Sequence, residues 1–197
     1  IEYSKTHQLK IGTIADLIQY RSEHESVVER LGEQKIATPW GAFRMIAYRD
    51  TVSGHPHLAL VHGIVDPDKE TLVRVHEPTS LLDVLDVNSP GHSWGVDRAM
   101  QAISRASSGV MVLLNCQGSA AHLLAQIDAW GRDPSTPATR KAAKMDLRTY
   151  GIGAQILRDL SVGQMRLLAR PRKMPSIMPG FGLTVTGYDD GPDFSHS

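Results

Sequence analysis

The sequence contains little cysteine, no net charge and no long hydrophobic run. Among its 197 residues Cys116 is the only cysteine, which excludes an internal disulfide and a cysteine-rich zinc cage. We expect this thiol to be a small buried side chain. The 21 basic and 21 acidic residues create no bulk field that would gather nucleic acid. Any phosphate site must therefore be built locally, and no nucleic-acid partner is expected.

Export and membrane signals are also missing. The sequence has no run of about 18 apolar residues, and residues 1–5 do not have the form of a signal peptide. The expectation is a cytoplasmic protein without a membrane partner. The chain starts without methionine, which suggests a piece of a longer polypeptide, although a processed or trimmed start would look the same. With 41% hydrophobic and 21% charged residues, it can form one substantial core or two small ones.

The first half predicts strands after a helical start. Apolar residues at mixed three- and four-residue spacing over 7–31 predict two short helices. Patterns at 42–48, 57–63 and 71–76 predict three strands, with turns at 38–41, 50–56 and 66–68. Short strands with tight connections favour an antiparallel sheet or a partial barrel.

Strands and helices alternate in the second half. The patterns predict helices at 96–106, 120–130 and 150–160, and strands at 109–114, 164–168 and 182–187. Residues 132–138 are typical of a loop, and residues 189–197 of a polar tail. The predicted fold class is mixed α+β or α/β, with antiparallel strands in the N-terminal half followed by alternating strands and helices.

One motif places an acid and an arginine beside a predicted helix start. Asp146 and Arg148 stand directly before the helix expected to begin near Tyr150. Arginine offers phosphate a forked cation, and aspartate can act as a base. An isolated Asp-x-Arg is more often an exposed ion pair at the head of a helix. The rest of the sequence has to decide between these interpretations.

Three segments in fixed order resemble GTP cyclohydrolase II, the enzyme that opens the guanine ring of GTP at the start of riboflavin synthesis. They are Leu-Val-Arg-Val-His at 72–76, the apolar strand at 109–114, and 146–157 with its continuation at 162–168. The likeness runs from about residue 36 to about residue 188.

Residues 7–21 resemble the join, in fused riboflavin proteins, between an N-terminal dihydroxybutanone phosphate synthase and the cyclohydrolase-like part. The resemblance implies a joining segment at 1–34, a cyclohydrolase-like domain at 35–190 and a polar tail at 191–197.

The resemblance also implies a zinc-activated water held by three cysteines. Thr79 stands where the first cysteine would be, and the run 86–94 replaces a Cys-x-Cys pair. A threonine hydroxyl is a poor zinc ligand, and zinc is what lowers the pKa of water toward about 7. His76 and His92 could form a substitute site, but their spacing matches no zinc signature. We expect no metal and no cofactor in this chain; magnesium is a candidate only for the longer protein.

The nucleotide-binding parts of the family are only partly present. Residues 115–119 lack the acid and the arginine that the family carries after its apolar strand. By resemblance, Asp146 matches the proposed general base, and Arg148 the residue proposed to attack the nucleotide phosphate. Arg74, Trp130 and Lys173 would bind the nucleotide or its phosphates, with Trp130 standing where the family has a tyrosine.

Three functions follow from the resemblance. The first is a catalytically silent domain, a pseudoenzyme that dimerises, stabilises or regulates a fused dihydroxybutanone phosphate synthase. The second is residual turnover of GTP, or release of pyrophosphate, through Arg148 and Asp146. The third is a nucleotide or flavin sensor whose anion site is lined by Arg74, Arg148, Arg170, Arg172 and Lys173. We favour the first, because each missing metal ligand or nucleotide clamp typically accounts for orders of magnitude in rate. The expected partners are the fused synthase and a second copy in a homodimer.

Overall fold

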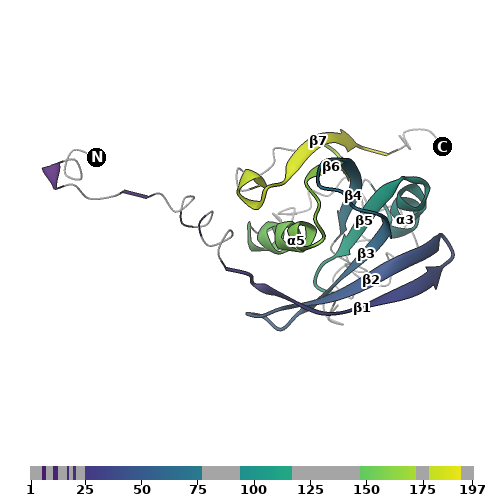
Figure 1. Cartoon of the computed structure of the whole chain (residues 1–197), viewed down its shortest axis with the longest axis horizontal. Helices are drawn as coiled ribbons and strands as arrows, with labels where there is room; N and C mark the ends of the chain where they lie inside the picture. Colours follow the sequence, from purple (N-terminus) through teal and green to yellow (C-terminus); the bar gives the residue numbers. More distant parts are fainter. Residues whose placement is uncertain are drawn as a thin grey trace, which may run out of the picture.

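In the part of the chain that the structure describes, a seven-stranded sheet carries a helix on each face (Figure 1). The structure is a computed structural model, and it describes residues 6–7, 11–12, 17, 20, 25–76, 94–116, 147–171 and 178–191. Its elements are β1 (Val28–Thr38), β2 (Gly41–Asp50), β3 (Pro56–Gly63), β4 (Glu70–His76), α3 (Val96–Arg105), β5 (Ser108–Leu113), α5 (Leu147–Asp159), β6 (Gln164–Leu168), η1 (Met178–Phe181) and β7 (Thr184–Asp189).

The sheet is antiparallel on one side and parallel on the other. Its strand order is β1-β2-β3-β5-β4-β6-β7. The pairs β1·β2, β2·β3 and β3·β5 are antiparallel, whereas β5·β4, β4·β6 and β6·β7 are parallel. The strand β5 therefore joins the two halves, and the parallel strands end at one common edge.

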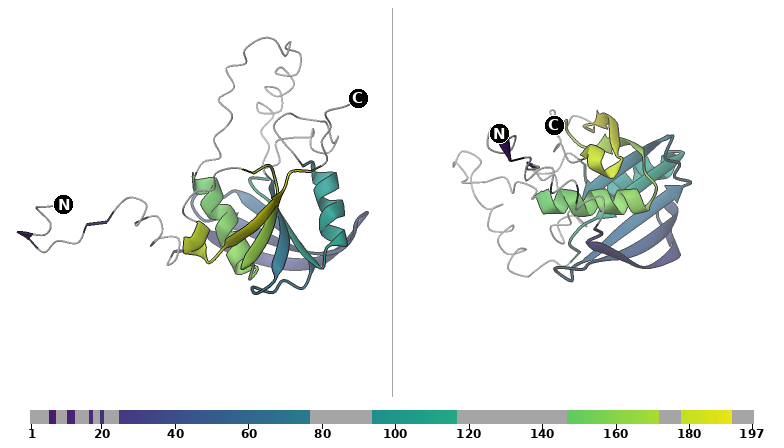
Figure 2. Two further views of the ribbon diagram at one scale, coloured as in Figure 1. Left: turned by 90° about the horizontal axis from the view of Figure 1, so that it is seen from above. Right: turned by 60° about the vertical axis from the view of Figure 1, so that its left-hand side comes forward.

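The two helices cover opposite faces of the sheet (Figure 2, left). Alternation along β5 shows this directly, since Val110 and Val112 belong to the core under α5 while Met111 belongs to the core under α3. Side chains of successive strand residues point to opposite faces. Gly109 lets α3 approach closely, because a Cβ at this position would lie 2.8 Å from Ile103 Cγ2. The strand is thus buried on both sides.

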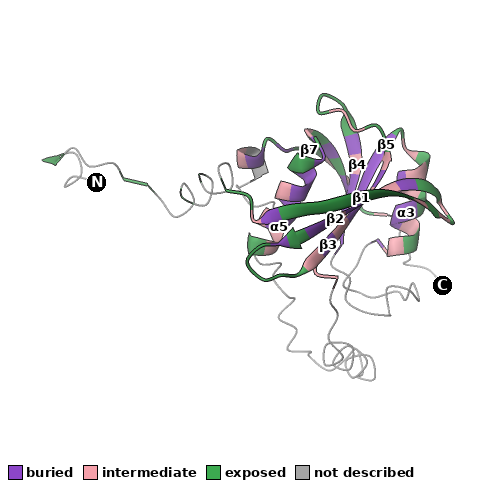
Figure 3. Ribbon diagram, turned by 60° about the horizontal axis from the view of Figure 1, so that its bottom comes forward, coloured by how far each residue is buried: buried purple, intermediate pink, exposed green. Residues whose placement is uncertain are grey.

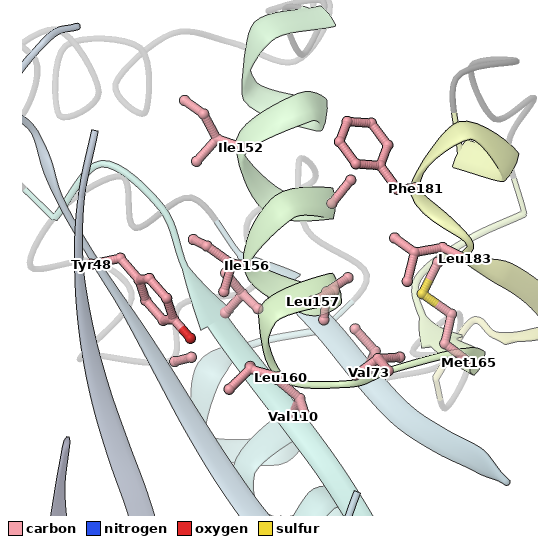
Figure 4. Packing of buried hydrophobic residues seen from close by; sticks show 14 of the residues in the cluster. Tyr48, Val73, Val110, Ile152, Ile156, Leu157, Leu160, Met165, Phe181 and Leu183 are labelled. Carbon is pink, nitrogen blue, oxygen red and sulfur yellow. The ribbon is translucent and has the colours of Figure 1, made fainter. Parts of the chain in front are cut away.

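The larger core lies between α5 and the sheet (Figure 4). Ile156 and Leu157 of the helix are 0% and 3% exposed and pack with Val73 and Val110 of the central strands. Complete burial of one such side chain stabilises the fold by about 1.5–3 kcal/mol. The smaller core under α3 contains Phe43, Trp94, Ala99, Met100, Ile103, Met111 and Leu168.

The edge strand β1 is mostly exposed, in contrast to β5 (Figure 3). Its charged side chains pair across the surface: Arg44 Nη1 lies 3.0 Å from Glu33 Oε1, and Arg49 Nη2 lies 2.6 Å from Glu29 Oε2. Charged side chains on an edge strand discourage pairing with another chain. Among the described residues, no helix is long and apolar enough to cross a bilayer.

The predicted mixed class is confirmed, and most predicted strands appear in place. The patterns at 42–48, 57–63, 71–76, 109–114 and 164–168 correspond to β2, β3, β4, β5 and β6, the helix at 96–106 corresponds to α3, and the strand predicted at 182–187 appears as β7.

Three predictions differ from the structure. Residues 28–31 form the start of β1 instead of a helix, so the boundary expected between residues 34 and 35 falls inside a strand. The helix α5 begins at Leu147, earlier than the predicted start near Tyr150. The three predicted strands do not form one antiparallel sheet, because β5 lies between β3 and β4 and runs parallel to β4. The predictions at 120–130 and 132–138 lie outside the described residues.

Candidate functional site

The candidate site lies at the edge where the parallel strands end. The carboxyl ends of β4, β5, β6 and β7 meet there, and the antiparallel register brings the start of β3 and the end of β2 to the same edge. Open sheets with parallel strands bind ligands in the crevice outside these carboxyl ends. The side chains at this edge therefore decide what the fold can do.

Arg74 ties three segments together at this edge. Its side chain is 7% exposed and projects from β4. Nη1 donates to the Leu168 carbonyl at 2.8 Å and Nη2 donates to the Trp94 carbonyl at 3.0 Å, joining the end of β6 to the residue before α3. A buried guanidinium needs such acceptors, because desolvation of an unpaired charge is costly. The Arg74 guanidinium therefore holds together the backbone segments at Leu168 and Trp94.

His76 completes the contacts of Arg74. Its ring is 1% exposed, and Nδ1 lies 3.3 Å from Arg74 Nη2. A guanidinium has no acceptor, so Nδ1 can only accept in this contact. A metal ion at Nδ1 would have to displace the arginine. This is the one member of the proposed His76 and His92 pair that the structure describes.

Trp94 joins the start of α3 to the end of β7. Its side chain is 8% exposed, and the indole Nε1 donates to the Asp189 carbonyl at 2.7 Å. Trp94 is also the last residue of the run that stands in place of the Cys-x-Cys pair in the resemblance. This position therefore holds a structural contact between two segments.

His57 and Cys116 lie beside β5 at the same edge. The buried His57 accepts at Nδ1 from the Asn115 N–H at 2.9 Å, and the half-buried Cys116 Sγ approaches the Leu113 carbonyl at 3.5 Å. Burial raises the pKa of the Cys116 thiol. A protonated thiol is a poor nucleophile and a poor metal ligand. Nδ1 of His57 is thus satisfied by a backbone group.

Arg148 contacts the opposite part of the edge, beside the turn between β2 and β3. Its Nη2 lies 2.7 Å from Asp50 Oδ2, with the arginine side chain 48% exposed and the aspartate 2% exposed. The carboxylate also accepts from the Val52 and Ser53 N–H groups at 2.8 and 3.1 Å and from the Ser53 hydroxyl at 2.7 Å. The ion pair anchors the first turn of α5.

Asp50 is ionised at neutral pH in this setting. Burial alone would raise the pKa of its carboxyl, but the hydrogen bonds from Ser53 and Val52 and the charge of Arg148 outweigh burial and bring the pKa to about 2. The carboxylate therefore fixes one edge of the Arg148 guanidinium, while much of that side chain stays open to solvent.

The predicted site residues do not form one cluster in the described structure. Arg74 and Arg148 reach the edge from β4 and α5, and the strands of Arg74 and Asp50 are separated by β3 and β5, about 14 Å along the sheet. Asp146, Trp130 and Lys173 lie outside the described residues. Within the described ranges, no three His, Cys, Asp or Glu side chains are placed to hold a metal ion.

Sequence reasoning missed Asp50. A signal was available, since aspartate followed by serine and glycine in a polar stretch is typical of a turn in which the carboxylate caps nearby N–H groups. That signal predicts the turn but gives no indication that Arg148, 98 residues later, binds the same carboxylate.

The sequence from β1 to the end of β7 matches a known family. The family model for GTP cyclohydrolase II matches residues 29–190, which is most of the described sheet and both helices. The chain belongs to the GTP cyclohydrolase II family. The match begins within β1.

Relatives of this family member carry riboflavin-pathway names. A 3,4-dihydroxy-2-butanone 4-phosphate synthase of Neisseria meningitidis is 44% identical over 96% of this chain and 50% of the relative. The riboflavin biosynthesis protein RibBA of Aquifex aeolicus is 38% identical over 94% of the chain and 47% of the relative. These relationships support a role in riboflavin biosynthesis.

A solved structure also matches nearly all of this chain with about half of its own length. It is RibBX, a two-domain 3,4-dihydroxy-2-butanone 4-phosphate synthase from A. baumannii, which is 33% identical with a TM-score of 0.57. The match covers 95% of this chain and 48% of that one. The chain thus spans about half the length of the relatives it matches.

Proposed function

We propose that this chain is a catalytically silent member of the GTP cyclohydrolase II family that supports a dihydroxybutanone phosphate synthase in the same polypeptide. The observation that carries the proposal is the set of hydrogen bonds that Trp94 makes. This residue belongs to the run that replaces the Cys-x-Cys pair, and its indole and carbonyl are both engaged in contacts between segments. The last residue of the run that stands in place of the cysteine pair therefore contributes to packing between segments.

The donor set of the chain does not fit zinc as this family would hold it. Zinc sites of this kind need thiolates or imidazoles in tetrahedral array. The chain has a single cysteine, its thiol pKa is raised by burial, and His76 turns Nδ1 toward a guanidinium. Without zinc, a water molecule lacks the activation that hydrolysis of a purine ring requires.

Metal analysis combined with a GTP assay tests the silent state. The full polypeptide that carries this chain should contain far less than one zinc per chain and should release neither formate nor pyrophosphate from GTP. Near-stoichiometric zinc together with formate release would overturn the proposal. Pyrophosphate release alone would favour a residual hydrolase acting through Arg148 and Asp146.

Removal of the domain tests the supporting role. The synthase should lose activity, solubility or its dimeric state when this chain is deleted from the full polypeptide. Unchanged activity, solubility and oligomeric state would contradict the proposed support. A homodimer is the oligomeric state that we expect, and light scattering of both proteins measures it.

Binding of a nucleotide without chemistry is a second candidate, favoured by the exposure of Arg148. Arginine binds phosphate well, and the Arg148 side chain is 48% exposed beside the buried Asp50 carboxylate. Thermal shift with GTP, GMP and FMN tests this function. A ligand at 100 times its dissociation constant adds about 2.7 kcal/mol of stability. No shift with any of the three would count against a sensor.

A further inference from the structure

The backbone that enters the domain is held by two elements far away in sequence. The Val27 N–H donates to Gln155 Oε1 at 2.8 Å, and Gln155 Nε2 donates to the Glu25 carbonyl at 2.9 Å. The Val27 carbonyl accepts from the Thr51 N–H at 2.9 Å and from its hydroxyl at 3.2 Å. Both backbone polar groups of Val27 are therefore satisfied by α5 and by the turn between β2 and β3.

The side chain of Gln155 takes the place of a neighbouring strand. A neighbouring strand offers a backbone C=O as acceptor and a backbone N–H as donor. The side-chain amide of glutamine offers the same two kinds of group, its oxygen and its NH₂. The orientation of the amide is fixed by its partners, because the Val27 N–H can only donate and the Glu25 carbonyl can only accept. Next to this clamp, Val28 is 8% exposed in the core under α5, and Val27 packs partly against that core.

The clamp belongs to one polar stripe of α5. Arg148, Gln155 and Asp159 stand at positions i, i+7 and i+11, which share one face of a helix. Arg148 binds Asp50, Gln155 binds the entering backbone, and Asp159 Oδ2 accepts from the Tyr48 hydroxyl at 2.6 Å and from Arg30 Nη1 at 3.0 Å. The whole length of the helix is thus fixed against β1, β2 and the chain that leads into them.

We propose that Gln155 fixes the direction in which the preceding part of the polypeptide joins this domain, so that the connection is rigid from residue 25 onward. The partner is the portion before the join, and its identity as a synthase rests on the proposed function. The family relatives are about twice as long as this chain, so they have room for such a preceding portion. Gln155 is a positioning residue in this proposal and takes no part in chemistry.

Hydrogen exchange in the full polypeptide tests the clamp. In Gln155→Ala the Val27 amide should exchange about tenfold faster, the size expected for loss of one backbone hydrogen bond, while the Val112 amide in the central strand keeps its rate. Gln164→Ala is the matched control, since this glutamine also donates to a backbone carbonyl, that of Asp68 at 3.3 Å, but lies on β6. It should leave Val27 unchanged.

A distance measurement gives the second readout. Spin labels at the exposed Val52 and at the exposed Glu25 should show a narrow distance distribution in the wild type and in Gln164→Ala. The distribution should broaden in Gln155→Ala. Equal acceleration at Val27 and Val112 would indicate global destabilisation only, and would overturn the proposal, as would an unchanged rate at Val27 or an unchanged distribution.

The two proposals fail separately. Unchanged synthase properties after removal of the domain would overturn the proposed function and leave the clamp intact. An unaltered Val27 amide in Gln155→Ala would overturn the clamp, whatever the synthase does. If Gln155→Ala does not fold, Gln155→Glu retains the acceptor for Val27 and loses the donor to Glu25. The distance distribution of that variant should then broaden, and an unchanged one would overturn the proposal.

Discussion

Two regions of the same sheet edge hold an arginine in opposite ways. Around Arg74 the guanidinium is buried and its acceptors include two backbone carbonyls, so the charge holds the fold together. Around Arg148 the carboxylate is the buried partner and the arginine side chain is 48% exposed. Both arginines were expected to bind phosphate. The difference indicates that a response to an anion would involve Arg148, while Arg74 is needed for the edge to form.

The largest effect is expected at the buried arginine. Arg74→Met keeps the aliphatic stem but leaves the carbonyls of Leu168 and Trp94 without this donor. Each buried unsatisfied group costs about 1–3 kcal/mol, so we expect the free energy of unfolding to fall by about 3 kcal/mol. Urea unfolding at pH 7 measures it. A loss smaller than about 1 kcal/mol would mean that the two arginines do not differ as described.

Loss of the Asp50 carboxylate, which contacts Arg148, should have the next largest effect on the free energy of unfolding, and this effect depends on pH. The folded pKa of Asp50 is about 2, below its ordinary value of 3.8. A lowered pKa contributes stability above the unfolded value, and that stability is lost as the pH falls from about 4 through about 2. The loss should amount to about 2 kcal/mol.

Asp50→Asn isolates this contribution. The variant should be less stable than the wild type at pH 7, and the difference should shrink as both proteins are titrated from pH 5 to pH 2. Thermal unfolding at each pH measures it, with Glu29→Gln as the control. Parallel curves for wild type and Asp50→Asn would contradict the assignment of the low pKa to Asp50.

Substitution of the half-exposed arginine should cost less. In Arg148→Ala, Asp50 keeps its hydrogen bonds from Val52 and Ser53, so the free energy of unfolding should fall by only about 1 kcal/mol. Any stabilisation of the wild type by pyrophosphate or GTP should disappear in the variant, as thermal shift would show. Robust GTP hydrolysis that this substitution abolishes would prove the domain to be an active enzyme.

An ion pair on the exposed strand should contribute least. Glu29 and Arg49 are both about half exposed, at 48% and 52% of their side chains. Such pairs contribute about 0.2–1 kcal/mol and weaken with salt, so Glu29→Gln should change the free energy of unfolding by less than about 0.5 kcal/mol. Urea unfolding at low and high salt is the measurement. A loss as large as that of Asp50→Asn would remove the contrast between surface and buried carboxylates.

Local patterns predicted most of the sheet because, within a single strand, the alternation of apolar and polar residues in the sequence matches the alternation of buried and exposed side chains. The exception at residues 27–31 has a physical cause. The register of β1 shifts between Arg30 and Gly32, so alternation is interrupted and Val27, Val28 and Leu31 acquire the spacing of a helix face. The insertion of β5 between β3 and β4 could not be predicted from periodicity, because strand order is a non-local property.

The site was predicted in part for the same reason. The resemblance pointed to Arg74 and Arg148, and both lie at the edge where parallel strands end. Their partners were not predicted, since Leu168 lies 94 residues from Arg74 and Asp50 lies 98 residues from Arg148. The roles of Asp146, Trp130 and Lys173 remain predictions.

The sequence by itself determined the mixed class of the fold, the positions of most strands, the family and the shortage of thiolates, because composition, periodicity and motifs are local properties of the chain. Only the tertiary structure decided what the polar residues of the family motifs do. Folding buried Arg74 against backbone carbonyls, placed Arg148 over a carboxylate and turned Gln155 to the entering backbone. These contacts join segments distant in sequence, and a side chain acquires its role from the partner that folding brings to it.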